Sequence, residues 1–78
     1  MEIEDLILEA AGRRLLPPPE QRRRIREQAN LTQCEVAGVL GTDASCISHY
    51  ERGTREPRGE MRKAYGALLD RLRREVLS

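Results

Sequence analysis

Two glycines in the middle of the chain, Gly41 and Gly53, constrain its fold more than any other residues. Each follows a short stretch with apolar residues at helical spacing, and glycine readily adopts the positive φ with which many helices end. Only a few residues can connect the two stretches. The sequence therefore predicts two short helices, over about residues 32–40 and 43–52, that cross at a steep angle.

Polar residues at the start of each stretch support these boundaries. Thr32 and Glu35 match a capping box, in which the hydroxyl accepts from the amide of Glu35 and the carboxylate accepts from the amide of Thr32. The carboxylate of Asp43 can cap the second helix. Ala37 stands where the two helices must approach each other, and a larger side chain there would overpack the contact by ~1–3 kcal/mol.

A run of three prolines, residues 17–19, separates these helices from the start of the chain. Consecutive prolines favour an extended backbone and allow a helix to begin only at the last of them. The segment that follows, EQRRRIREQ, has no helix breaker and places opposite charges four residues apart. We therefore expect a helix from Pro19 to about Gln28, with Ile25 and Ala29 facing its core side.

Both ends of the chain are also predicted to be helical. An apolar face recurs at helical spacing over residues 2–11, and another runs along residues 59–77, formed by Met61, Tyr65, Leu68, Leu72 and Val76. The chain has no Trp or Phe, so aliphatic residues must build its core. The sequence predicts an all-α fold: a compact helical bundle with an N-terminal helical extension over residues 1–16 and one domain over residues 17–78.

The net charge of +1 hides an uneven distribution. Residues 1–12 carry four acids and no base, whereas residues 13–30 carry six arginines against two glutamates, and residues 59–78 carry five bases against three acids. Local patches, rather than the total charge, govern binding to nucleic acids. We interpret the run Arg22–Arg24 as a solvated helix face, because most charge runs on helices are solvated.

Several classes of protein are disfavoured by what the sequence lacks. Cys34 and Cys46 lack the close spacing of zinc ligands, so we expect reduced thiols and no metal or cofactor. The acidic start MEIEDLILEA does not match a secretory signal, and no apolar run approaches the ~20 residues of a transmembrane helix. We therefore expect a cytoplasmic protein. Since no catalytic constellation or phosphate-binding glycine loop is evident, we do not expect an enzyme.

The segment LTQCEVAGVLGTDASCISHYERG resembles the Cro and phage-repressor type of helix-turn-helix, also called the xenobiotic response element (XRE) family. The resemblance covers about residues 18–72. It depends on the TQxE start, the small Ala37, the turn residue Gly41 and the YERG ending occurring together. It implies a lambda-repressor-like DNA-binding domain that inserts the helix over about residues 43–52 into the major groove of double-stranded DNA.

The resemblance also implies roles for individual residues. Base contacts fall on one face of the second motif helix: Ala44, Ser45, Ser48 and His49. Contacts to the DNA backbone fall on Gln33, Thr42, Cys46, Arg52, Arg55 and Arg58. Arg26 and Glu51 match positions that form a structural ion pair in relatives. The base-contacting face lacks the Arg, Gln and Asn side chains that make bidentate base contacts, and DNA shape could supply the rest of the recognition.

These features favour a bacterial or phage transcriptional repressor. As a homodimer it would bind a near-palindromic operator whose half-sites lie about one helical turn apart, ~34 Å. Two alternatives remain open. The chain could be an antitoxin or another interaction module that binds a partner through its apolar terminal helices. It could also be a DNA-architectural or excision accessory factor that bends DNA. No small-molecule ligand is evident from the sequence.

Overall fold

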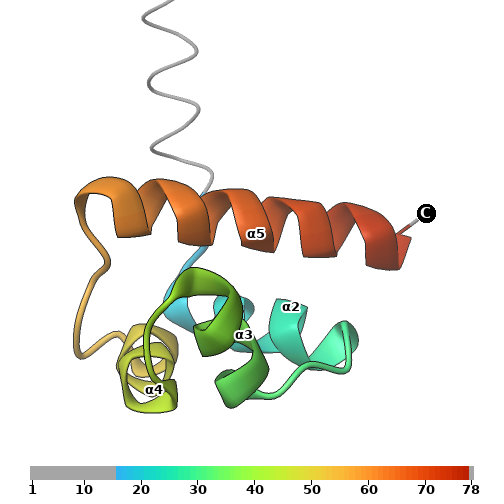
Figure 1. Ribbon diagram of the computed structural model, residues 1–78. Coiled ribbons are helices and arrows are strands. Elements are labelled where there is room, and N and C mark those ends of the chain that lie inside the picture. Colours follow the sequence, from blue (N-terminus) through green and yellow to red (C-terminus); the bar gives the residue numbers. More distant parts are fainter. Residues whose placement is uncertain (1–15, 78) are drawn as a thin grey trace, which may run out of the picture.

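The computed structural model describes residues 16–77, which form four helices: α2 (Pro19–Gln28), α3 (Gln33–Leu40), α4 (Ala44–Arg52) and α5 (Gly59–Leu77). No strand occurs in this part of the chain, so the predicted all-α fold is confirmed. The helix predicted over residues 2–11 lies outside the described residues. α5 lies along one side of the molecule, and the three shorter helices pack beneath it (Figure 1).

Helix α2 begins at the last residue of the proline run, as predicted. Proline is well suited to the first turn of a helix, where its missing N–H would have had no partner within the helix. The helix ends at Gln28, and the chain turns through Asn30, which has a φ of 59°. Ile25 is buried and Ala29 packs against the core, so the inner face of α2 is the predicted one.

Helix α3 begins with the predicted capping box. The amide of Glu35 donates to Oγ1 of Thr32 at 3.0 Å, and the amide of Thr32 donates to Oε1 of Glu35 at 2.9 Å. The helix ends at Gly41, which adopts the left-handed conformation with a φ of 72°. Ala37 is only 2% exposed, which agrees with the close crossing of α3 and α4 predicted from its small side chain.

Helix α4 is fixed at both ends. At its start, the carboxylate of Asp43 accepts from the amide of Cys46 at 2.8 Å. At its end, Gly53 has a φ of 75° and lies so close to the start of α2 that a Cβ atom there would be 3.0 Å from Cγ of Pro19. A contact this short is tighter than nine in ten real Cβ contacts, so Pro19 would have to shift by a few tenths of an ångström. The chain therefore leaves α4 through a conformation that favours glycine and a space that is tight for any side chain.

The core lies where the shorter helices meet the underside of α5. Its buried hydrophobic members are Ile25, Val36, Ala37, Ile47, Tyr50, Tyr65, Leu69 and Leu72. The stripe predicted along α5 was partly wrong: Leu69, which was not included, is 1% exposed, and Val76, which was included, is 40% exposed. The last turn of α5 extends beyond the helices beneath it (Figure 1), so none of the other three described helices covers Val76.

Candidate nucleic-acid interface

Helix α4 has two faces of very different character. Its inner face carries Ile47, Tyr50 and Glu51, which are all less than 9% exposed. Its outer face carries Ser45, which is exposed, and Ala44, Ser48 and His49, which are partly exposed. These four outer residues are the predicted base contacts. The structure therefore places them together on one accessible side of a helix that is anchored by its other side.

His49 is already engaged in one contact. Its Nδ1 atom lies 2.8 Å from Oγ1 of Thr54, in the turn that follows α4, and the same hydroxyl lies 3.3 Å from the carbonyl oxygen of His49. These contacts fix the orientation of the imidazole ring, which is partly exposed. Nε2 is therefore the ring nitrogen that can reach a base edge.

A buried carboxylate connects α4 to the two helices that precede it. The guanidinium of Arg26 donates from Nε to Oε2 of Glu51 at 2.6 Å and from Nη2 to Oε1 at 3.0 Å. A third donor of Arg26, Nη1, reaches the carbonyl oxygen of Leu31 at 2.9 Å. The bond to Glu51 raises the pKa of Arg26 above its ordinary value. This is the ion pair implied by the family resemblance, and its fork geometry holds α2 against α4.

Gln33 joins the same carboxylate. Its Nε2 donates to Oε1 of Glu51 at 3.1 Å, and the residue is partly buried. The sequence predicted that Gln33 contacts the DNA backbone. In the structure, one N–H of its side-chain amide donates to Glu51 instead. The second N–H of that group remains as a donor, because a primary amide carries two. Glu51 thus sets the direction in which Gln33 can offer a hydrogen bond at the start of α3.

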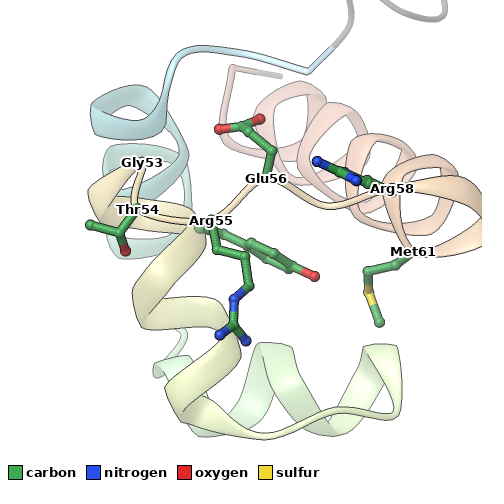
Figure 2. A pocket seen from close by; sticks show the side chains of 7 residues that line it. Gly53, Thr54, Arg55, Glu56, Arg58 and Met61 are labelled. Atoms are coloured by element: carbon green, nitrogen blue, oxygen red, sulfur yellow. The ribbon is translucent and has the colours of Figure 1, made fainter.

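The remaining predicted backbone contacts lie around the two ends of α4. Thr42 and Cys46 are partly exposed near its start, and Arg52 is exposed near its end, with Nε 3.4 Å from the carbonyl oxygen of Ser48. Arg55 and Arg58 are exposed on the loop between α4 and α5. The last two line an open cleft of about 600 Å³, together with Tyr50, Gly53, Thr54, Glu56 and Met61 (Figure 2).

One charged residue that the sequence interpretation misplaced is Arg22. It was expected on a solvated face with the rest of the run Arg22–Arg24, but it is 3% exposed. Arg23 does lie on such a face and pairs with Glu27 at 3.2 Å. A signal was present in the spacing, because Arg22 precedes Ile25 by three residues and Ala29 by seven, which places all three on one side of a helix.

Two tyrosines pack together beneath the ion pair. The ring centroids of Tyr50 and Tyr65 are 5.3 Å apart. Burial, with a smaller contribution from the Cys46 thiol, raises the pKa of Tyr50 to about 12. Burial also raises the pKa of Tyr65, and the neighbouring Glu51 carboxylate raises it further. The hydroxyl of Tyr65 is buried and has no hydrogen-bond partner among the described residues.

Comparison with known protein families identifies this arrangement. Residues 23–71, more than half of the chain, match a helix-turn-helix family. The chain belongs to the helix-turn-helix family of the Cro and phage-repressor (XRE) type. This is a family of DNA-binding regulators, so the match implies that the chain binds DNA. No curated protein and no solved structure gave a significant match to the chain.

Two further features are absent from residues 16–77. No helix there combines the length and apolar character needed to cross a bilayer. No group of three or more His, Cys, Asp or Glu side chains in the same part of the chain could hold a metal ion. Both cysteines are free thiols, Cys34 exposed and Cys46 partly exposed.

Proposed function

We propose that this protein is a sequence-specific transcriptional regulator of bacterial or phage type that binds double-stranded DNA and acts as a repressor. In this proposal α4 enters the major groove, and the DNA-binding unit is residues 17–78 with residues 1–16 as an extension. The observation that carries the proposal is the division of α4 into a buried inner face and an accessible outer face of small polar residues. A helix with its side chains is about 10–12 Å across, which suits a groove about 12 Å wide.

The proposed base contacts are Ala44, Ser45, Ser48 and His49. A serine hydroxyl can donate to or accept from any base, and the methyl group of alanine can contact the methyl group of thymine. The ring nitrogen Nε2 of His49 adds a further polar contact. These small side chains favour a close approach of the helix backbone to the bases, and sequence-dependent DNA shape would supply the rest of the specificity.

The proposed backbone contacts surround that face. Arg52, Arg55 and Arg58 follow the base-contacting residues along the chain and are all exposed, so they suit the phosphates on one side of the groove. Thr42 and Cys46 lie at the start of α4. Gln33 stands at the start of α3, where the free amides of the helix terminus also favour an anion. A homodimer would place two copies of α4 in successive major grooves, ~34 Å apart.

The burial of the apolar face of α5 favours a repressor over an interaction module such as an antitoxin. Tyr65, Leu69 and Leu72 of its apolar face are buried in the core, and Val76 is the large hydrophobic residue of α5 that stays exposed among the described residues. A partner protein would therefore find little apolar surface on that helix. A repressor needs only to occupy the operator and so exclude other proteins from it.

The test is to select duplexes from a random pool with the purified protein and to compare the best sequence with a scrambled one. We expect at least a 10³-fold preference at physiological salt, as is typical of specific DNA binding. His49→Ala should change which base is preferred at one position. Arg55→Ala should weaken binding to both duplexes and lower the salt slope of log Kobs by about 0.9, which corresponds to one phosphate contact.

Equal binding of selected and scrambled duplexes would remove the claim of sequence specificity. A phased-bending assay on the selected duplex separates a regulator from an architectural factor, since only the latter requires a strong bend. Reporter repression from a promoter that contains the selected duplex then tests the direction of regulation.

A further inference from the structure

The buried guanidinium of Arg22 makes four hydrogen bonds. Nε donates to the carbonyl oxygen of Pro17 at 2.7 Å, and Nη1 donates to the carbonyl oxygen of Tyr50 at 3.0 Å. Nη1 and Nη2 also reach the two carboxylate oxygens of Glu56, at 3.1 and 3.0 Å. A cation is tolerated in such a buried position only when an anion and hydrogen-bond acceptors compensate for its lost hydration.

Its partner Glu56 stands in the loop that carries two of the proposed phosphate contacts. Arg55 and Arg58 flank it in sequence, and all three line the same cleft. The side chains of Arg55 and Glu56 leave the loop in opposite directions (Figure 2). Pro57, the next residue, is among the most deeply buried of the protein. The loop is therefore held by both Glu56 and Pro57 while its arginines remain exposed.

We propose that Arg22 is a positioning residue for the DNA-backbone contacts of this loop. By holding both oxygens of Glu56, it keeps this carboxylate directed away from Arg55 and neutralises its charge. Without Arg22, the carboxylate would be free to pair with Arg55 or Arg58 and to repel a phosphate. This inference rests on the proposed function, because it explains how Arg55 and Arg58 are kept available for phosphates.

The experiment measures binding of a fluorescent mixed-sequence duplex over a range of salt concentrations. Arg22→Met should lower the affinity and reduce the salt slope by about 0.9, as expected if one phosphate contact is lost. Adding Glu56→Gln to Arg22→Met should restore most of the slope, because no free carboxylate remains to occupy an arginine. A residue that merely supports the fold would not give this recovery, since the double variant lacks the same buried ion pair.

Arg23→Met is the matched control. It removes the same charge from the neighbouring position of α2, but the side chain of Arg23 is 65% exposed and lies outside the Glu56 network. We expect its salt slope to match that of the wild type. A slope reduced as much as in Arg22→Met would mean that loss of net charge alone explains the effect, and the inference would be wrong.

Glu56→Gln alone keeps Arg22 in place and provides a second test, because the amide oxygen of glutamine can still accept from the guanidinium. Circular dichroism first confirms that the variant is folded. If Arg22 already neutralises the carboxylate and turns it away, this variant should keep the wild-type slope. An increase of about one would show that Glu56 acts on phosphates even in the wild type, which overturns the inference. A wild-type protein that binds no duplex at all would instead refute the proposed function.

Discussion

The inner face of α4 packs against the rest of the protein, whereas its outer face makes few contacts with it. The inner face contributes Ile47 and Tyr50 to the core and places Glu51 in a network with Arg26 and Gln33. The outer face contributes Ala44, Ser45, Ser48 and His49, whose one hydrogen bond between side chains runs from His49 to Thr54. One side of the helix therefore determines where it lies, and the other is available to determine what it contacts.

This difference implies that stability and DNA preference can be altered separately. Substitutions on the inner face and its supports should unfold the protein before they change its DNA preference. Substitutions on the outer face should change the DNA preference and leave the protein folded. A domain of this size has a stability on the order of 5 kcal/mol, so the effects of inner-face substitutions are large on that scale.

The largest effect is expected for Glu51→Ala. It removes the partner of a largely buried guanidinium, whose side chain is 12% exposed, and the loss of one member of such a pair costs about 3–5 kcal/mol. Urea unfolding followed by circular dichroism measures the loss. Because the whole domain has a stability on the order of 5 kcal/mol, a free energy of unfolding of only about 0–2 kcal/mol should remain. A variant with nearly the stability of the wild type would contradict the role of Glu51 as the link between the three helices.

The next largest effect is expected for Ala37→Leu, on the α3 side of the crossing. Ala37 is 2% exposed, and a larger side chain should overpack the contact with α4 at a cost of about 1–3 kcal/mol. Gly38→Ala is the control, since a Cβ atom at Gly38 meets nothing within 4 Å. Equal melting temperatures for Ala37→Leu and the wild type would argue against a close approach of the two helices.

Alkaline pH should destabilise the protein through its two buried tyrosines. An unfolded tyrosine ionises near pH 10, whereas burial holds the pKa of Tyr50 at about 12 in the folded protein. The stability associated with this difference is complete below pH 10 and is lost as the pH rises toward 12. The expected slope is up to about 1.4 kcal/mol per pH unit for each tyrosine. The range from about pH 9 to about pH 11 brackets the pKa of an unfolded tyrosine. A free energy of unfolding that stays constant over this range would contradict the prediction.

Tyr65→Phe should stabilise the protein at neutral pH by about 1 kcal/mol, because it removes a buried hydroxyl that has no hydrogen-bond partner within residues 16–77. The same variant should also show a smaller alkaline loss than the wild type. Thermal unfolding at neutral and alkaline pH measures both effects. If the variant is instead less stable at neutral pH, the hydroxyl must have a partner that compensates for its burial.

The smallest effect on stability is expected for Ser45→Ala on the outer face. Ser45 is exposed and its substitution should change the free energy of unfolding by no more than about 0.5 kcal/mol. Its effect on DNA should be larger, with about 1 kcal/mol of discrimination lost at one base position. Competition binding with single-base variants of the selected duplex measures this. A clear drop in stability would erase the distinction between the two faces.

The local part of this structure could be predicted from the sequence. The capping box at Thr32 and the glycines at positions 41 and 53 determine helix boundaries through interactions within a few residues, and such interactions leave a direct pattern in the chain. The extent of the buried stripe on α5 could not be predicted as well. Whether Leu69 or Val76 is covered depends on where the other helices end, and periodicity alone does not contain that information.

The candidate interface shows the same limit. The outer face of α4 followed from a family resemblance and from helical spacing. The buried Arg22 was missed because a charged residue usually lies in solvent, even though its spacing from Ile25 placed it on the inner face. Its partner Glu56 is 34 positions away, and no local pattern could connect the two. Contacts over such separations become apparent only once the helices are assembled.

The close approach of Gly53 to Pro19 limits how this protein can change over time. A substitution at Gly53 would strain the backbone and also displace the start of α2, so a single mutation there has two separate penalties. The four residues on the outer face of α4 carry neither restriction. A preference for a new DNA sequence could therefore evolve by substitution of those four residues one at a time, while the turn that follows them stays unchanged.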